Sequence, residues 1–382
     1  MQKREKNVRF YTHIRLNEYT FAEKMMRALL LISFIMFFSS IRSEEKVITI
    51  SNSTEVQRSE VVEIDNKGLE ASNKSFVVKN ALGQEVPWQL THDGKLLLYV
   101  TVQPQSKAVF KLEQGTPKPQ KSWVGGRQYR ERKDDLSFEN DRMGFRIYGP
   151  ALQRGGERAY GIDLWLKRTP ELVLDTIYRR RHYHIDNGLG LDCYNVGPTL
   201  GCGAPARMVG HSIAYSWCYT NYEILDNGPL RFTVALDFEG GERRIVSLDR
   251  GSHFCRTTVT WPQPVDICTG IVLHAPLSIW KEVGGEALLY VDPTRDPKKY
   301  NFQIYTGVLC PDGFDETREL LFPQPQKDAL GHLLGIKRNV NGLTYYNGAA
   351  WSDYDIPTWE AWQLYVRQYL EALQHPLEIQ IQ

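Results

Sequence analysis

The stretch HDGKLLLYVTV, residues 92–102, decides the fold class of the N-terminal region. It joins a turn signal, HDG, to a run of strand-forming residues, and further short runs follow the same pattern at residues 47–50, 60–64, 75–78 and 108–112. The turn signal DNKG lies at residues 65–68. Closely spaced short strands with turn residues between them are typical of a β-sandwich, so we predict one over residues 44–115.

The chain beyond the polar, proline-containing segment 116–121 also favours strands. We expect strands at 171–185, 211–225, 230–239, 253–261 and 268–275, with turns at 227–229 and 239–241. Helices do not alternate with these strands, which excludes a doubly wound sheet. We therefore predict a second, larger β-sandwich over residues 122–382, which would hold the active site.

A single helix is expected at residues 358–374. Thr358 can cap its first turn, and Pro357 ends the preceding segment. Apolar residues recur at steps of three or four along this helix, at Trp359, Trp362, Val366, Tyr369 and Leu373. Such a stripe is usually buried, so we expect the helix to dock on a sheet.

The composition is that of an ordinary globular protein. Of the 382 residues, 42% are hydrophobic and 24% are charged, which excludes collagen, a disordered tail and a multi-span membrane protein. The formal net charge is only +1, so no excess of positive charge indicates nucleic-acid binding. Aromatic residues make up 12% of the chain, and such residues can stack on sugar rings.

Residues 1–43 have the features of a secretory signal peptide. They contain eight Lys or Arg and three Asp or Glu, and an apolar run of eleven residues at 28–38 that is too short for a stable membrane span. Ser43 is small enough to precede the cleavage site. We expect translation to start at Met25 or Met26, and the mature chain to be exported across the inner membrane to the periplasm.

Six cysteines lie in the mature chain, at positions 193, 202, 218, 255, 268 and 310. An even number in an exported protein permits disulfides. None belongs to a C-x-x-C pair, so a structural zinc site is not expected. We expect most of them to be buried free thiols.

Two charged segments contain candidate functional residues. The first, residues 130–142, ends in Arg142 and leads into an aromatic strand, where it is either a solvated loop or the lining of a sugar cleft. The second is taken as a strand over 172–186, which would place alternate residues, including Arg180, His182 and His184, on one face. Arginine binds carboxylates, and histidine acts as an acid or a base.

His182 and His184 can be read in two other ways. They are a potential metal pair, with a third ligand from His211, His253 or His274, or they are structural, hydrogen-bonded histidines. The spacing alone does not identify a metal site. We therefore expect no cofactor, with a divalent metal as the alternative.

Two further segments supply candidates for substrate contacts. The glycine-rich stretch 188–203 holds Asp192 and Tyr194 but lacks the Lys-Ser/Thr of a phosphate-binding loop. Tyr346 and Trp351 lie just before the helix and form either an aromatic wall or part of the core.

Five blocks of sequence resemble the domain-of-unknown-function family 4861. They are ERKDD at 131–135, ENDR at 139–142, YGPAL at 148–152, YHIDNGLGLDCYNVG at 183–197 and YYNGAAWS at 345–352. The likeness covers roughly residues 46–373 in the same order, and the sequence departs from the pattern at residues 179–181 and Cys193. It implies an exported bacterial protein of polysaccharide breakdown, with genes for lyases and unsaturated-uronyl hydrolases nearby. One similar member is associated with dehydration of the uronic acid at the end of ulvan-type oligosaccharides.

The expected fold is all-β: the small N-terminal sandwich, then a large mutarotase-like β-supersandwich closed by the C-terminal helix. The resemblance implies two β-domains, and we extend it to the mutarotase type. It supplies no catalytic residues.

The expected function is elimination on a uronic-acid-containing oligosaccharide, most simply loss of water across C4–C5. Arg180 or Arg142 would neutralise the substrate carboxylate, with Asp192, Tyr346 and Trp351 as further contacts. His184 is the first choice as base and His274 the second, while Tyr194 or His182 would protonate the leaving hydroxyl.

Two alternatives stay open. A polysaccharide lyase would use the same chemistry with a sugar as the leaving group. A carbohydrate-binding protein without activity would depend on aromatic residues and not on His184. The clustering of titratable groups favours an enzyme. Its partner would be the oligosaccharide, with no nucleic acid and no stable membrane span.

Overall fold

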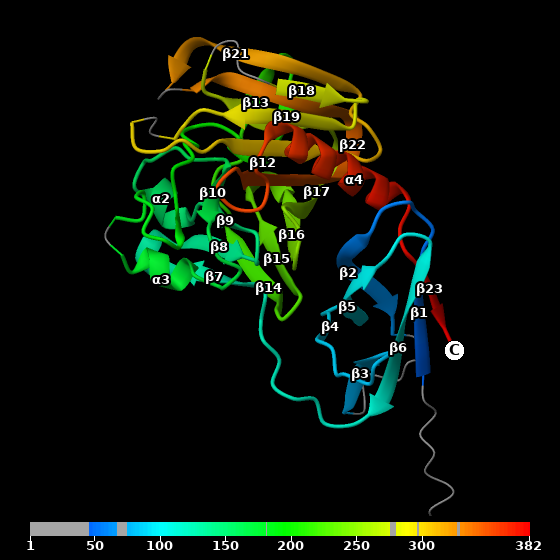
Figure 1. Ribbon diagram of the computed structural model, residues 1–382. Helices are drawn as coiled ribbons and strands as arrows, with labels where there is room; N and C mark the ends of the chain where they lie inside the picture. Colours follow the sequence, from blue (N-terminus) through cyan, green and yellow to red (C-terminus); the bar gives the residue numbers. More distant parts are fainter. Residues whose placement is uncertain (1–45, 67–74, 181, 276–279, 296–297, 327–328) are drawn as a thin grey trace, which may run out of the picture.

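The computed structural model describes residues 46–66, 75–180, 182–275, 280–295, 298–326 and 329–382 (Figure 1). Antiparallel strands make up most of these residues, and a single long helix lies near the C-terminus. The all-β prediction, with a small N-terminal sandwich, a large sandwich and a C-terminal helix, is therefore confirmed. The expected signal peptide at residues 1–43 lies outside the described residues.

The small sandwich consists of two facing sheets. One has the order β23-β1-β6-β3 and the other β2-β5-β4. The strands are β1 (Lys46–Asn52), β2 (Arg58–Asp65), β3 (Phe76–Asn80), β4 (Trp88–Leu90), β5 (Lys95–Val102), β6 (Ser106–Gln114) and β23 (Glu378–Ile381). Alternate residues such as Ile48, Ile50, Leu96 and Leu98 are fully buried between the sheets. The stretch that indicated the fold class, residues 92–102, forms the turn before β5 and the strand itself.

The last strand of the chain returns to this first domain. Residues 378–381 of β23 pair antiparallel with β1, from Ser51 opposite Glu378 to Ile48 opposite Ile381, and Figure 1 shows the C-terminus beside β1. The sequence placed these residues within the large domain at 122–382. The small sandwich is thus assembled from both ends of the described chain.

The large domain contains a five-stranded sheet and an eleven-stranded sheet. The former has the order β11-β10-β9-β8-β7 and consists of β7 (Gly125–Tyr129), β8 (Asp135–Glu139), β9 (Met143–Ile147), β10 (Ile162–Lys167) and β11 (Gly190–Leu191). Short helices η1 (Arg130–Arg132), α2 (Pro150–Arg154) and α3 (Leu174–Tyr178) lie in its connections.

The eleven-stranded sheet is built around two very long strands that pair with each other, β17 (Phe254–Leu273) and β22 (Ala329–Trp351). The other strands are β12 (Cys202–Val209), β13 (Ser212–Ala214), β14 (Asn221–Asn227), β15 (Arg231–Asp237), β16 (Arg243–Asp249), β18 (Trp280–Val283), β19 (Ala287–Asp292), β20 (Ile304–Leu309) and β21 (Glu316–Gln326). A short helix, η2 (Glu239–Gly241), connects β15 to β16. The strands expected at 253–261 and 268–275 are both parts of β17.

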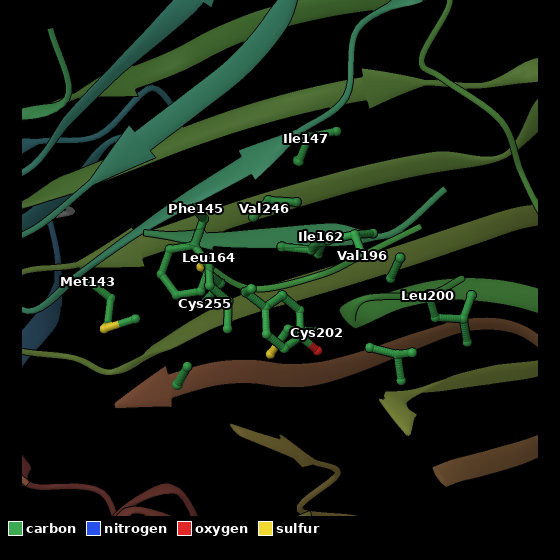
Figure 2. Close-up of a cluster of buried hydrophobic side chains, with 14 of the residues drawn as sticks. Met143, Phe145, Ile147, Ile162, Leu164, Val196, Leu200, Cys202, Val246 and Cys255 are labelled. Atoms are coloured by element: carbon green, nitrogen blue, oxygen red, sulfur yellow. The ribbon is translucent and has the colours of Figure 1, made fainter. Parts of the chain in front are cut away.

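The core of the large domain lies between its two sheets. Phe145 of β9 and Leu164 of β10 are fully buried against Cys202, Val246 and Cys255 of the large sheet, and Figure 2 shows these side chains in one cluster. Because strand side chains alternate, the residues between them must lie on the opposite, outer face of the five-stranded sheet. That outer face carries the candidate site.

Helix α4 (Trp359–Gln374) confirms the predicted helix and its packing. The Thr358 hydroxyl accepts a hydrogen bond from the Ala361 amide at 3.1 Å, as an N-cap does. Trp362, Val366 and Leu370 are buried, in one cluster with Phe254 and Tyr305 of the large sheet.

The predicted strand over 171–185 is wrong. Residues 174–178 form the short helix α3, and turns follow it. Val173, Leu174, Ile177 and Tyr178 are buried, a helical spacing that packs one face on the sheet. Arg180, His182 and His184 therefore do not share a strand face. The segment 211–225 also differs from the prediction, because it forms two strands, β13 and β14, with irregular chain between them.

All six cysteines are free thiols, and five of them are buried. This agrees with the expected buried thiols. Neither α4 nor any shorter helix in the described part of the chain is long and apolar enough to cross a membrane.

The N-cap of α4 gives a testable prediction. Thr358→Ala removes the hydroxyl that satisfies the Ala361 amide, so the free energy of unfolding should fall by about 1 kcal/mol. Thr358→Ser retains the hydroxyl and should stay near wild type. Urea unfolding of the three proteins measures the difference, and equal stability of the Ala and Ser variants would contradict the capping role.

Candidate active site on the outer face of the five-stranded sheet

The outer face of the five-stranded sheet carries a cluster of buried charges. Asp135 comes from β8, Arg146 from β9 and Asp163 from β10, and all three are at most 9% exposed. Asp192, which follows β11, is also buried. Charged residues are rarely buried without a partner, so this arrangement needs a physical account.

Arg146 is the hub of this charge cluster. Its guanidinium forms an ion pair with Asp163, and its Nη2 lies 3.4 Å from the Asp192 carboxylate. Arg146 also donates a hydrogen bond to the Tyr148 hydroxyl at 3.2 Å, and that hydroxyl donates to Asp163 at 3.0 Å. The guanidinium of Arg146 therefore interacts directly with two carboxylates, those of Asp163 and Asp192.

Burial controls the protonation of the carboxylates. It raises the pKa of Asp192 well above its ordinary value, and the nearby Asp163 raises it further. Burial also raises the pKa of Asp135 to about 6, although Arg146 and the Gly149 amide, which donates to Asp135 at 2.9 Å, oppose the shift. Burial alone would lower the pKa of Arg146, but Asp163, Tyr148 and Asp192 raise it well above its ordinary value. The arginine therefore keeps its charge, whereas Asp192 holds a proton more readily than an exposed carboxyl.

His184 lies at the solvent-facing edge of this cluster. Its Nδ1 is 2.8 Å from the Asp192 carbonyl oxygen and 3.8 Å from the Asp192 carboxylate, and its side chain is 64% exposed. Because a carbonyl only accepts, Nδ1 must carry the proton, and in a neutral imidazole Nε2 then has a free lone pair. Within the described chain, Nε2 has no hydrogen-bond partner. The structure thus presents a basic nitrogen to solvent.

Two of the other candidate histidines, His274 and His253, are held differently. The ring nitrogens of His274 contact the Asp292 carboxylate and the Asn195 carbonyl, each at 2.7 Å. Those of His253 contact the Ala349 carbonyl at 2.9 Å and the Asp355 carboxylate at 3.0 Å. An acceptor oxygen faces each of the two nitrogens of both rings, so neither ring presents a free nitrogen to a substrate.

The aromatic ring of Tyr183 lies beside His184 and also contacts an arginine. The Tyr183 ring is 4.3 Å from the His184 ring, and the Arg132 guanidinium lies 4.3 Å from the Tyr183 ring and 5.2 Å from the Tyr178 ring. Among the described residues, no carboxylate forms an ion pair with Arg132. A half-buried guanidinium without an ion-pair partner suits an anionic ligand.

The structure brings some of the predicted site residues together. His184 and Asp192 are in contact, and Asp192 is buried rather than open to solvent. His182 and Arg180 are exposed nearby in sequence, and Arg180 makes only a long contact, 3.4 Å, to the Asn187 carbonyl. Tyr194 is buried in the core, and its ring is perpendicular to the His274 ring, with centroids 5.9 Å apart.

Other predicted residues lie elsewhere in the fold. Arg142 lies at the opposite end of the β8–β9 hairpin and is ion-paired with Asp355 at 2.7 Å. Trp351 is fully buried, with its Nε1 donating to the Lys167 carbonyl at 2.8 Å, so it presents no face to a sugar. Tyr346 lines a separate cavity between the two domains.

No three His, Cys, Asp or Glu side chains are arranged to hold a metal ion within the ranges that the structure describes. Two of the three histidines considered as a third ligand beside His182 and His184 are bonded elsewhere, as described for His253 and His274. The absence of a cofactor remains a prediction, with a divalent metal as its alternative.

The sequence analysis did not identify Arg146 and Asp163, the ion pair at the centre of the charge cluster. Arg146 interrupts the otherwise apolar strand MGFRI, and Asp163 precedes the apolar run LWL in IDLWLK, so these charges were a usable signal. Arg132 and Tyr148 lie in two of the blocks that resemble family 4861, but neither was singled out. The proximity of Arg146 and Asp163 depends on the register between β9 and β10, which the sequence does not specify.

The comparisons with known proteins identify the family. The model of the family described as "Domain of unknown function (DUF4861)" matches residues 50–379, and the chain belongs to this family. The "Uncharacterized protein P7" of Formosa agariphila is 28% identical over 383 residues, which covers 89% of this chain and 94% of that protein.

A solved structure shows a related fold. An alpha-mannosidase from Enterococcus faecalis V583 superposes with a TM-score of 0.50 over 90% of this chain, at 9% identity. This chain covers 46% of that mannosidase chain. A protein in the Glycosyl Hydrolase Family 38 from Enterococcus faecalis has a TM-score of 0.49 at 8% identity, and 48% of its chain is covered. At such low identity the likeness to the mannosidase concerns the fold alone.

The raised pKa of Asp135 gives a prediction about stability. The folded protein binds the Asp135 proton more tightly than the unfolded chain, so this residue lowers stability as pH rises from its ordinary pKa of 3.8 to about 6. The loss corresponds to roughly 3 kcal/mol. Asp135→Asn keeps an oxygen for the Gly149 amide but cannot ionise. Relative to this variant, the wild type should therefore lose stability between pH 4 and pH 7.

Urea unfolding of both proteins at several pH values measures this difference. Other titrating groups cancel in the comparison because the two chains share them. A stability difference that stays constant with pH, or that grows in favour of the wild type, would show that Asp135 is not held as a neutral acid.

Proposed function

We propose that this protein catalyses an elimination on uronic-acid-containing oligosaccharides, in which water is lost and an unsaturated uronyl end is formed. The observation that carries the proposal is that the Tyr183 ring contacts both His184, whose Nε2 is free and faces solvent, and Arg132, whose guanidinium has no ion-pair partner among the described residues. The resemblance to family 4861 supports the substrate class, and the fold is shared with a carbohydrate-active enzyme.

The first half of the reaction removes the hydrogen on C5. This hydrogen is α to a carboxylate and only weakly acidic, so the negative charge that develops must be stabilised. Arg132 would pair with the substrate carboxylate, while His184 Nε2 takes the proton. Arg132 replaces Arg180 and Arg142 in this role because Arg180 is exposed and Arg142 is already paired.

The second half breaks the C4–O bond. The electrons of the C5–H bond form the C4=C5 double bond, and the departing hydroxyl takes a proton to leave as water. Tyr194 is too deeply buried to supply this proton, whereas exposed His182 and the neighbouring Tyr183 remain candidates. After the step His184 is an imidazolium, whose Nδ1–H stays bonded to the Asp192 carbonyl.

Asp192 acts through His184 and is therefore a positioning residue. Its backbone carbonyl fixes the tautomer of the imidazole, and its amide donates to the Tyr183 carbonyl at 3.0 Å. Arg146 lies close to the Asp192 side chain within the cluster. The proposed steps use only side chains of this chain, and the exported enzyme would act on the oligosaccharide in the periplasm.

The assay uses the mature chain and a panel of saturated uronic-acid oligosaccharides. Absorbance of the new conjugated double bond reports elimination, and mass spectrometry identifies the product. Loss of one water is the expected result. Shorter chains would make the protein a polysaccharide lyase, and binding without any absorbance change would make it a carbohydrate-binding protein.

His184→Ala tests the base. A positioned base contributes about 10²–10⁴-fold to the rate, so the variant should lose at least that order of kcat while its melting temperature stays near wild type. His211→Ala is the matched control, since His211 is an exposed histidine in the turn between β12 and β13. Full activity of His184→Ala would remove this residue from the mechanism.

Arg132→Gln tests the carboxylate partner. Removing one group that stabilises developing charge costs about 10²–10³ in rate, so kcat/KM on the uronate substrate should fall by this order. Arg180→Gln, at an exposed arginine in the same region, should retain the wild-type value. If the two variants behave alike, Arg132 does not bind the carboxylate.

A further inference from the structure

The phenol ring of Tyr183 is held in place beside the proposed base. Its centroid lies 4.3 Å from that of the His184 ring and 5.5 Å from that of the buried Trp165 ring. The Arg132 guanidinium lies 4.3 Å from the same ring. The backbone is fixed as well, because the Tyr183 carbonyl accepts a hydrogen bond from the Asp192 amide at 3.0 Å. These contacts leave the ring little freedom to move.

The hydroxyl of Tyr183 takes no part in holding the fold together. The residue is half-buried, and its hydroxyl forms no hydrogen bond within the described part of the chain. The neighbouring Tyr178 differs, because its hydroxyl is buried and lies 2.7 Å from that of Ser137. Buried tyrosine hydroxyls usually find such a partner. An ordered phenol with an open hydroxyl can therefore give its proton to a ligand.

His182, the other candidate acid, is less well placed. Its side chain is exposed in a turn, and no hydrogen bond, ion pair or ring contact orders it among the described residues. Loss of water across C4–C5 removes groups from two adjacent carbons, so the acid must lie next to the base. The ring that contacts His184 is that of Tyr183.

The contact between the two rings also limits how a sugar can approach them. Carbon atoms in contact lie about 3.5–4.0 Å apart, so groups that touch the two opposite faces of a sugar ring are separated by about 7 Å. The ring centroids of Tyr183 and His184 are only 4.3 Å apart. No sugar ring fits between these side chains, so both must approach it from the same side.

We propose that Tyr183 is the general acid of the elimination, and that it acts with His184 on one face of the sugar ring. The elimination is then syn. This assignment rests on the proposed function and deepens it, because it adds the source of the second proton and the stereochemistry of the substrate.

The step balances in protons and electrons. His184 Nε2 takes the hydrogen on C5, and the electrons of the C5–H bond form the C4=C5 double bond. The C4–O bond breaks with its electrons on oxygen, which takes the Tyr183 hydroxyl proton and leaves as water. The guanidinium of Arg132 stabilises the resulting phenolate by its positive charge. Solvent then returns a proton to the phenolate and removes one from the imidazolium.

Syn elimination selects the configuration of the uronic acid. The hydrogen on C5 and the hydroxyl on C4 must lie on the same face of the ring for the two groups to reach both. They do so in D-glucuronate and D-mannuronate, and they lie on opposite faces in D-galacturonate and L-iduronate. A terminal D-glucuronate should therefore be turned over faster than a terminal D-galacturonate, by roughly 10²-fold or more.

Tyr183→Phe tests the acid because it keeps the ring and removes the proton. A positioned acid contributes about 10²–10⁴-fold, so kcat should fall by this order while KM and the melting temperature stay near wild type. Tyr160→Phe is the matched control. Tyr160 is also half-buried, its ring stacks on Tyr215 with centroids 4.7 Å apart, and its hydroxyl has no hydrogen-bond partner among the described residues. This variant should keep the wild-type kcat.

A change of leaving group separates proton donation from a structural role. Fluoride at C4 departs as an anion and needs no proton, so Tyr183→Phe should recover most of the wild-type rate on a 4-deoxy-4-fluoro-glucuronate substrate. His184→Ala should stay inactive on the same substrate, because the hydrogen on C5 must still be removed. An equal loss of rate on the hydroxyl and fluoro substrates would show that Tyr183 only supports the packing of the site.

The outcomes distinguish this assignment from the proposed function. A wild-type protein that forms no unsaturated product from any of these uronates would contradict the proposed function itself. If the wild type is active, full activity of Tyr183→Phe would overturn the assignment of the acid. Faster turnover of D-galacturonate than of D-glucuronate would overturn the syn geometry.

Discussion

The ion pair between Arg146 and Asp163 is the interaction on which the candidate site depends. Both residues are buried on the outer face of the five-stranded sheet, where two further carboxylates, Asp192 and Asp135, lie close by. Breaking a buried ion pair by removing one partner is expensive, about 3–5 kcal/mol, because the other charge is left uncompensated. Replacing such pairs by apolar residues is often neutral or stabilising, so stability alone does not explain the cluster.

The cluster matters for the candidate site because it positions Asp192, which contacts His184. Asp192 reaches towards Arg146 from the chain after β11, and its backbone holds both Tyr183 and His184. The result is a rigid connection from the sheet to an exposed imidazole with its basic nitrogen outward. The same neighbourhood contains an arginine without an ion pair, Arg132, so a base and an anion-binding group lie beside the same tyrosine.

The sequence predicted the parts of the fold that depend on local pattern. The small sandwich and helix α4 follow from alternation, turn residues and a capping threonine, which act over a few residues. Residues 171–185 were read as a strand because alternate polar residues masked the helical spacing of Val173, Leu174, Ile177 and Tyr178. The contribution of β23 to the first domain is a long-range pairing, which local pattern does not reveal.

The candidate site was predicted only in part, for the same physical reason. His184 and Asp192 stand out by residue type, and the structure joins them. Arg146 and Asp163 come together through the register of β9 and β10, where Arg146 pairs opposite Asp163. Trp351 was a candidate for stacking on a sugar because aromatic residues occur both in protein cores and in ligand sites. Only its burial in the structure distinguishes these two roles.

The most direct test of this account is the tautomer of His184, measured by ¹⁵N nuclear magnetic resonance near neutral pH and assigned with the His184→Ala variant. The account predicts that the neutral ring carries its proton on Nδ1, which donates to the Asp192 carbonyl, and that Nε2 is unprotonated. A neutral ring protonated on Nε2 would contradict it, because the nitrogen that faces solvent would then be a donor and could not act as the base.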